Sequence, residues 1–322
     1  MSAIEGHRVA VYYQTQYDNS LPSNSAFGHY VSPLPLLGLI THLFLAAFHI
    51  NTDKSVHLND NLPEAPFFTQ MWQDLGQMQD QGVKLLPLTT DNFDTYYPIL
   101  ANYITEFNLD GMDLDVEQST SLSVITNLIT RLKSDFGADF IITLAPVATA
   151  MTEGSNLSGF DYITLEQQMG SQISWYNAQF YSGFGTLFPD TQYIDIINFG
   201  SGLDPNRLVA SVLTSPANGD GYVSPDEVVS SVQDLLRATA STLEGSTGGH
   251  FCYTDYFNSN PNSTEPWLWA QMMSDAMASL KEAKANVKAA DREPHDRSHV
   301  TQTVTRDRGK FYTVVPTTGR IN

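Results

Sequence analysis

The sequence has little cysteine and little positive charge. Cys252 is the single cysteine in 322 residues, so no disulfide can form within the chain, and the fold has to be held by packing, as suits a reducing compartment. Lys and Arg number 16 against 35 Asp and Glu, which leaves a net charge of −19. That charge repels phosphate backbones and anionic lipid, so nucleic acid and membranes are excluded as partners. No apolar run approaches the roughly 18 residues of a membrane span.

The chain also lacks the signals of a leader peptide, a bound dinucleotide and a metal site. Its first residues, MSAIEGHRVAVYY, contain no basic flank followed by an apolar run, so we expect a cytoplasmic protein; a secreted chain already trimmed of its leader would read the same way. No Gly-rich turn follows VAVYYQTQYD, which argues against a dinucleotide. The eight histidines have no metal-ligand spacing, so we expect neither a metal nor another cofactor, and we expect His42 to be packed or at a rim.

Short β-rich runs alternate along the chain with amphipathic stretches at helical spacing. The eight predicted strands are VAVYY from Val9, ITHLFLAAF from Ile40, VKLLPL from Val83, DGMDLDVE from Asp110, FIITLAP from Phe140, NAQFYS from Asn177, LVASVL from Leu208 and GHFCYTDYF from Gly249. Strands that alternate with helices predict right-handed βαβ units and a parallel sheet. Eight such units close most naturally into an α/β fold of the (β/α)8 TIM barrel type, with an open doubly wound sheet as the alternative.

The distribution of charge divides the chain into two parts. Residues 281–322 contain nine basic and five acidic residues, whereas residues 1–280 contain seven basic and 30 acidic ones. We therefore predict a single barrel domain over residues 1–280 and a polar, mobile C-terminal extension over residues 281–322. One apolar patch, FYTVV at residues 311–315, interrupts the extension and could serve as an edge strand or a docking arm.

The segment DGMDLDVE at residues 110–117 carries the strongest chemical signal. Side chains alternate along a strand, so Asp113, Asp115 and Glu117 share one face and the intervening apolar residues share the other. If the apolar face packs on helices, the carboxylates face the barrel interior, where they raise one another's pKa and retain a proton, as a general acid requires. Because such barrels carry their active site at the C-terminal ends of the strands, we expect Glu117 to contact the substrate first.

This segment matches the DGxDxDxE signature, and the chain resembles the family 18 glycoside hydrolases, the chitinases and endo-β-N-acetylglucosaminidases, most of all their fungal members. The resemblance spans roughly the first 280 residues and includes VAVYYQTQYD, LITHLFLAAFHI, TLAP from Thr143 and SWYNAQFYSGFG from Ser174. It implies a (β/α)8 barrel that cleaves glycans containing β-linked N-acetylglucosamine without a cofactor.

The resemblance also implies roles for single residues. Glu117 would protonate the glycosidic oxygen, and Asp115 would turn between Asp113 and the 2-acetamido group of the substrate. The carbonyl oxygen of that group would attack the anomeric carbon to form an oxazolinium ion, so the sugar supplies the nucleophile, an exception to the two-carboxylate scheme. Tyr181 would hydrogen-bond the acetamido oxygen. The residues predicted to bind the substrate are Gln179, Asp110 and Tyr253.

Two positions depart from the family pattern. Thr89 and Thr90 stand where a Gly-Gly pair is expected after the third strand. Because glycines let a sugar approach the backbone, this part of the groove should be narrower or differently shaped. The eighth strand offers Tyr253 or Thr254 in place of the tryptophan expected under the sugar. Two later tryptophans fall in a predicted helix and are expected to pack instead: Trp267 and Trp269.

These departures leave three functions open. The first is a retaining glycosidase that acts on N-acetylglucosamine glycans. The second is an intracellular enzyme that uses Glu117 as an acid on a non-chitin, biosynthetic small molecule, and the third is a carbohydrate-binding or structural pseudoenzyme. The partner is a glycan or a small molecule, and the sequence predicts no particular oligomeric state.

Overall fold

Two units make up the chain, residues 1–283 and residues 284–322. The computed structural model describes residues 8–50, 55–89, 93–200, 202–242, 250–254, 256 and 259–290, so only residues 284–290 of the second unit are described. The boundary expected at residue 280, and the character of the extension beyond it, remain predictions.

Eleven strands lie within the described residues. They are β1 (Val9–Tyr13), β2 (Tyr17–Asp18), β3 (His29–Tyr30), β4 (His42–Ile50), β5 (Val56–Leu58), β6 (Lys84–Thr89), β7 (Gly111–Leu114), β8 (Ile141–Leu144), β9 (Trp175–Gln179), β10 (Leu208–Leu213) and β11 (His250–Thr254). Each of the eight predicted strands overlaps one of these. The three additional strands, β2, β3 and β5, have two or three residues each, too few to show a hydrophobic period.

Eight of the strands form a ring of parallel pairings. β1 pairs with β4 on one side and with β11 on the other, and the ring follows chain order through β4, β6, β7, β8, β9, β10 and β11. β5 pairs with β4 in the antiparallel sense, so the sheet is mixed rather than purely parallel as predicted, and β2 and β3 form a separate antiparallel hairpin.

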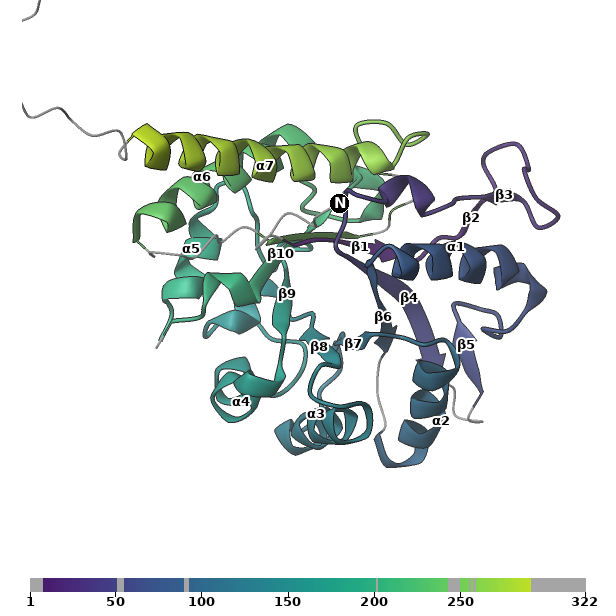
Figure 1. Cartoon of the computed structure of the whole chain (residues 1–322). Coiled ribbons are helices and arrows are strands. Elements are labelled where there is room, and N and C mark those ends of the chain that lie inside the picture. The colour runs from purple at the N-terminus through teal and green to yellow at the C-terminus, as the bar shows by residue number, and fades with distance from the viewer. Residues whose placement is uncertain are drawn as a thin grey trace, which may run out of the picture. The chain divides into compact units, whose positions relative to one another are not determined.

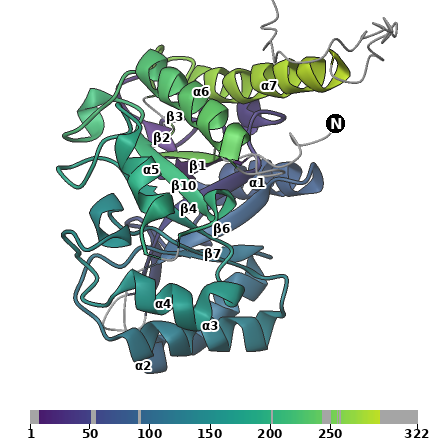
Figure 2. The ribbon, with the colours of Figure 1, turned by 90° about the vertical axis from the view of Figure 1, so that its left-hand side faces the viewer.

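Helices lie around the outside of the strands (Figures 1 and 2). They are α1 (Thr69–Asp80), α2 (Phe93–Glu106), α3 (Leu122–Phe136), α4 (Tyr162–Met169), α5 (Thr191–Asn198), α6 (Pro225–Thr242) and α7 (Trp267–Ala290). The sequence pattern indicates all of these except α4 and α5, which span only eight residues each, about two turns. Over the described part of the chain, no helix combines the length and hydropathy needed to cross a membrane.

Two layers of apolar side chains hold the strands in place. All five residues of β1 are buried: Val9, Val11 and Tyr13 pack in a large cluster that also includes the apolar faces of the helices. Ala10 and Tyr12 point the other way, into a small cluster inside the ring. This alternation follows from the two-residue period of a strand whose two faces are both covered. The other buried members of the inner cluster are Phe44, Ala46, Trp175 and Val209.

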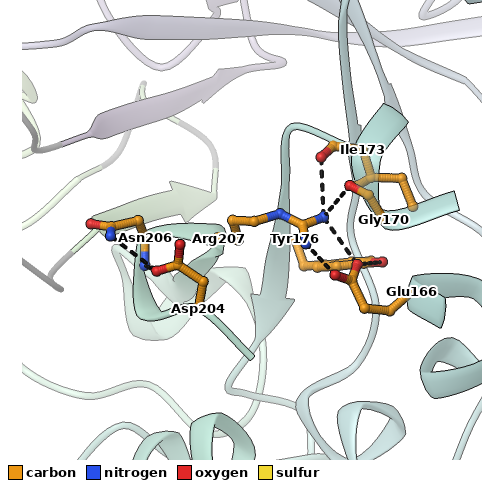
Figure 3. A network of polar contacts seen from close by, with 7 residues as sticks. All are labelled: Glu166, Gly170, Ile173, Tyr176, Asp204, Asn206 and Arg207. Carbon is orange, nitrogen blue, oxygen red and sulfur yellow. Dashed lines mark hydrogen bonds and ion pairs between the residues drawn. The ribbon is translucent and has the colours of Figure 1, made fainter. Parts of the chain in front are cut away.

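An arginine-centred network joins α4 to β9 and to Arg207, the residue that precedes β10 (Figure 3). Both terminal nitrogens of Arg207 donate to the carboxylate of Glu166, and Nη2 also donates to the carbonyl oxygens of Gly170 (2.8 Å) and Ile173 (3.1 Å). The hydroxyl of Tyr176 donates to the same carboxylate at 2.8 Å, and the guanidinium carbon lies 5.8 Å from the centroid of its ring. A two-point pair of this kind orients both partners, so the network sets how α4 lies against the sheet.

We expect the variant Arg207→Met to lower the free energy of unfolding by about 2–3 kcal/mol, because it removes four charge-assisted contacts and leaves Glu166 without its cation. Urea unfolding measures this loss. The matched control is Arg131→Met, which breaks an ion pair with Asp135 on the face of α3, where the Arg131 side chain is 59% exposed. Its loss should be much smaller, and equal losses in the two variants would contradict the role of the network.

Candidate active site

Asp113 lies at the centre of a buried hydrogen-bond network inside the ring. Its carboxylate accepts hydrogen bonds from the hydroxyls of Tyr12 (2.7 Å) and Thr143 (2.5 Å). Nδ2 of Asn177 donates a third, at 3.0 Å. These donors come from β1, β8 and β9, and Asp113 has no exposed surface. Burial raises the pKa of Asp113, and the three donors oppose that rise because they stabilise the charged form.

Gly111 allows β7 to approach β8 closely at the start of this segment. A Cβ atom at Gly111 would lie 2.6 Å from the Cβ of Ile141 and would also clash with the carbonyl oxygen of that residue. Gly111 and Ile141 are register partners in the parallel pairing of the two strands. The glycine of the DGMDLDVE segment therefore has a packing role, and the close approach brings Thr143 of β8 to Asp113.

Asp115 and Glu117 lie in the loop that follows β7, which ends at Leu114. Asp115 is partly buried and Glu117 is exposed. Nε2 of Gln179, at the end of β9, donates to the carbonyl oxygen of Ala145 at 2.8 Å and lies 3.3 Å from Oδ1 of Asp115 and 3.5 Å from Oε1 of Glu117. One amide nitrogen thus bridges the two carboxylates.

The charge of Asp115 is disfavoured at this position. Burial raises the pKa of Asp115 well above its usual value, and the charges of Glu117 and Asp113 raise it further, while the hydrogen bond from Gln179 lowers it. A carboxyl group in these surroundings holds its proton to a higher pH than an exposed one does. The cluster therefore combines a proton-retaining carboxyl, Asp115, with an exposed one, Glu117.

The loop before α4 holds the backbone between the two carboxylates. The hydroxyl of Ser158 donates to the carbonyl oxygen of Val116 at 2.6 Å, and the hydroxyl of Tyr162 lies 2.8 Å from the same Ser158 oxygen. Just past Glu117, the backbone N–H of Thr120 donates to the carbonyl oxygen of Ser158 at 2.9 Å. Ser158 and Tyr162 are both buried, so these hydrogen bonds fix the backbone path of residues 116–120.

Tyr181 follows the end of β9, two residues after Gln179. Phe180, between them, is buried and stacks with Tyr193 of α5, with ring centroids 6.3 Å apart. Because the backbone N–H of Phe180 still pairs with the carbonyl of Ser211 on β10, the alternation of the strand continues and places Tyr181 on the side of Gln179. Tyr181 is partly buried.

Comparison with known proteins places this arrangement in a family. No protein-family model matches the chain. A solved fungal endo-β-N-acetylglucosaminidase from glycosyl hydrolase family 18 is 38% identical, with a TM-score of 0.74, over 84% of this chain and 97% of that one. A chitinase from Aspergillus fumigatus is 40% identical, with a TM-score of 0.71, over 84% and 99%. The chain belongs to glycoside hydrolase family 18.

Two further proteins show a more distant similarity to this chain. Exochitinase 1 of Streptomyces olivaceoviridis is 24% identical over 201 residues, which are 47% of this chain and 34% of that protein, so the match spans about a third of the curated relative. A family 18 chitinase from Cycas revoluta was solved in complex with (GlcNAc)3; it is 13% identical, with a TM-score of 0.52, over 84% and 99%, a likeness of fold alone.

One predicted substrate contact of the family 18 chain, Asp110, is not brought together with the other predicted site residues. Asp110 lies before β7, at the end of the strand opposite to Glu117, and its carboxylate forms an ion pair with Lys84 at 2.8 Å. Nε2 of Gln79 donates to the same carboxylate at 3.1 Å. Six residues separate Asp110 from Glu117, so the side chain that begins the acidic segment lies at the base of the ring and the last one lies toward the opposite end.

Several predictions fall outside the described residues. They concern the side chains of Thr89, Thr90, Tyr253 and Thr254, so the expected narrowing of the groove and the replacement under the sugar remain predictions. The tryptophans of α7 are packed as expected: Trp269 is fully buried in the large cluster, and Trp267 packs against that cluster while partly exposed. Over the described part of the chain, no three His, Cys, Asp or Glu side chains gather as metal ligands would.

His42 is a packed histidine, as expected. Its ring meets Trp175 edge to face at 4.7 Å, and the hydroxyl of Thr41 lies 2.8 Å from Nδ1. Burial, together with the positive charges of Arg8 and Lys84, lowers the pKa of His42 to about 3. The imidazole is therefore neutral at physiological pH, and it packs at the base of the ring of strands.

Sequence reasoning missed five residues of the site. Four of them carry a hydroxyl or amide group at a buried position, and such a group requires a hydrogen-bond partner. These four are Thr143, Asn177, Ser158 and Tyr162. The fifth, Tyr12, sits in an apolar strand and gives no such signal. Only the fold reveals that its hydroxyl reaches Asp113.

Proposed function

We propose that the chain is a retaining glycosidase that cleaves glycans with β-linked N-acetylglucosamine, with Glu117 as the general acid. The observation that carries the proposal is the shared contact of Gln179 with Asp115 and Glu117 at the end of β9. The names of the relatives at 38% and 40% identity, an endo-β-N-acetylglucosaminidase and a chitinase, support the substrate class. The pairings of β1 with both β4 and β11 support a closed (β/α)8 barrel as the scaffold.

The proposed reaction has two steps. Glu117 gives its proton to the glycosidic oxygen as the bond from that oxygen to the anomeric carbon breaks. The carbonyl oxygen of the substrate's 2-acetamido group forms the new bond to the same carbon, which yields an oxazolinium ion and the free leaving sugar. In the second step Glu117 takes a proton from water, the water oxygen attacks the anomeric carbon from the face that the leaving group vacated, and the acetamido group is restored. Two inversions give net retention.

Asp115 and Asp113 have separate roles in this proposal. Asp115 hydrogen-bonds the acetamido N–H, and as positive charge develops on the oxazolinium ring its raised pKa falls, so it becomes a counter-ion when one is needed. Asp113 stays in place because three donors hold its carboxylate, and its negative charge favours a proton shared with Asp115. Tyr181 orients the acetamido oxygen from the side of Gln179.

Chitin oligosaccharides and high-mannose N-glycans offered side by side test the proposal. Mass spectrometry identifies the products and NMR of the first product gives its anomeric form. We expect cleavage between N-acetylglucosamine units, with the β-anomer formed first. The substrate that is cleaved faster distinguishes a chitinase from an endo-β-N-acetylglucosaminidase. The proposal would be contradicted if neither substrate is cleaved, or if the α-anomer forms first.

If the chain has this activity, Ser158→Ala should lower kcat by about tenfold with little change in KM, because residues 116–120 lose their anchor and Glu117 loses its alignment. The matched control is Tyr162→Phe, which keeps the Ser158–Val116 bond and should cost less. A change in the pH profile of kcat in Ser158→Ala would accompany the loss, since the spacing of Asp115 and Glu117 changes. A variant with lower thermal stability but unchanged kcat and pH profile would limit Ser158 to a structural role.

A further inference from the structure

A small cavity lies between the β2–β3 hairpin and the segment that leads into α7, two regions on the same side of the molecule (Figure 1). Its volume is about 180 Å³, below the roughly 300 Å³ at which ordinary small-molecule sites begin, so any occupant is small. None of the residues proposed for glycan cleavage lines it. We call it the hairpin cavity; the residues that define it are Asp18, His29, Tyr30, Ser32, Thr264 and Trp267.

Three hydroxyl groups that line the hairpin cavity donate their hydrogens to other protein groups. Those of Tyr30 and Ser32 both donate to the carboxylate of the buried Asp74, at 3.0 and 2.6 Å. The hydroxyl of Thr264 donates to Oδ1 of Asn262 at 2.8 Å. A hydroxyl has one hydrogen and two lone pairs, so each of these groups has only acceptor capacity left for a ligand.

His29 adds a further acceptor. Its Nδ1 lies 2.7 Å from the carbonyl oxygen of Pro22. A carbonyl oxygen only accepts, so Nδ1 carries the hydrogen, and in the neutral ring Nε2 is left with a lone pair. His29 stands opposite Asp18 in the register of the hairpin, which places the imidazole and the carboxylate on neighbouring strands of one wall.

Asp18 supplies the negative charge. Its Oδ1 accepts hydrogen bonds from the N–H (2.8 Å) and the hydroxyl (2.6 Å) of Ser20. Among the described residues Asp18 has no ion pair, and neither Lys nor Arg lines the cavity. The chain as a whole carries a net charge of −19.

The rest of the wall is hydrocarbon and aromatic. Leu21, Val31 and Pro35 line one part and the ring of Trp267 another. Aromatic rings beside a carboxylate attract organic cations, and the acceptors described above select for cations that carry N–H donors.

We propose that the hairpin cavity binds a small primary ammonium ion, with the charged nitrogen at Asp18 and the hydrocarbon body against Trp267. Every polar group on the wall with a known partner is an acceptor, so a neutral alcohol satisfies fewer of them and a quaternary ammonium satisfies none by donation. This site is independent of the proposed glycosidase activity.

Calorimetric titration of the full chain with three ligands that share a benzyl group tests the proposal: benzylammonium, benzyl alcohol and benzyltrimethylammonium. We expect benzylammonium to bind at least about tenfold more tightly than the other two, a difference of about 1.4 kcal/mol. Benzyl alcohol binding as tightly as benzylammonium would overturn the need for charge. Benzyltrimethylammonium binding as tightly would overturn the need for N–H donors, and no saturation by any ligand at millimolar concentration would overturn the site.

Variants locate the binding. Asp18→Asn should weaken benzylammonium by at least about tenfold, whereas Asp195→Asn, which removes the same charge from the exposed face of α5, should leave it unchanged. Glu117→Gln should also leave it unchanged. If Glu117→Gln weakens the binding and Asp18→Asn does not, the ammonium binds at the acidic cluster of β7 and the hairpin cavity is not its site. The three ligands are titrated into the unaltered chain, so they test the proposal even if Asp18→Asn fails to fold.

Discussion

Glu117→Gln is expected to lower the rate of cleavage of a chitin or N-glycan substrate by about 10²–10⁴-fold, because the amide cannot give a proton to the leaving oxygen. The change is nearly isosteric, and Glu117 is exposed, with its only described side-chain contact at 3.5 Å from Gln179, so the fold should be unaffected. Initial rates measured by product chromatography, together with thermal unfolding of the variant, check both statements.

The leaving group separates an acid from a residue that merely binds. An N-acetylglucosamine oligomer with an activated aryl leaving group departs as a stable phenolate and needs little protonation, so Glu117→Gln should lose much less activity on it than on the natural glycosidic bond. The control is Glu106→Gln, which changes an exposed glutamate at the C-terminal end of α2 and should retain full activity. An equal loss on both leaving groups would contradict the assignment of Glu117 as the general acid.

Asp115→Asn is expected to have two effects of opposite kind. Activity should fall by about 10²-fold or more, because the amide cannot become a counter-ion to the oxazolinium ring. Thermal stability at neutral pH should rise, because the substitution removes a carboxylate whose charge is disfavoured by burial and by its neighbours Glu117 and Asp113. Removing a functional group while gaining stability is the pattern of a site held under electrostatic strain.

The sign of the pH dependence follows from the raised pKa of Asp115. In the unfolded chain an aspartate titrates near its usual pKa of about 3.9, whereas in the folded chain Asp115 keeps its proton to a higher pH. The folded state therefore binds more protons across this window, so the contribution of Asp115 to stability is greatest below about pH 4 and is lost as the pH rises through the folded pKa.

This contribution is measured as the difference in melting temperature between Asp115→Asn and the unaltered chain from pH 4 to 9. The advantage of Asp115→Asn over the unaltered chain should be absent near pH 4 and grow as the pH rises. Asp195→Asn, an exposed carboxylate, should show no such growth. A difference that shrinks with rising pH would mean that the folded pKa of Asp115 is lowered.

The fold and the site were predictable to different extents. The runs VAVYY and LVASVL are strands with the boundaries expected from the sequence, because each is buried on both faces and needs no distant partner to be recognised as a strand. The acidic segment was read as one strand through Glu117, yet β7 ends at Leu114. Ser158 draws the backbone at Val116 into a loop, and that contact lies 42 residues away in the chain.

The order of the carboxylates was determined by the sequence alone. The two-residue period of a strand places Asp113 on the face opposite to Met112 and Leu114, and the direction of the chain places Asp115 and then Glu117 after it. Local geometry is sufficient for both statements.

Only the tertiary structure decided what each carboxylate does. Asp113 is held by Tyr12, Thr143 and Asn177, which lie 101, 30 and 64 residues away in the chain, and Gln179 reaches Asp115 and Glu117 from 64 and 62 residues away. Asp110, which the sequence groups with them, is paired with Lys84 at the other end of the strand instead. The pKa of a carboxyl group depends on burial and on the charges and donors within a few ångströms, and those neighbours are brought together by the closing of the ring of strands rather than by proximity along the chain.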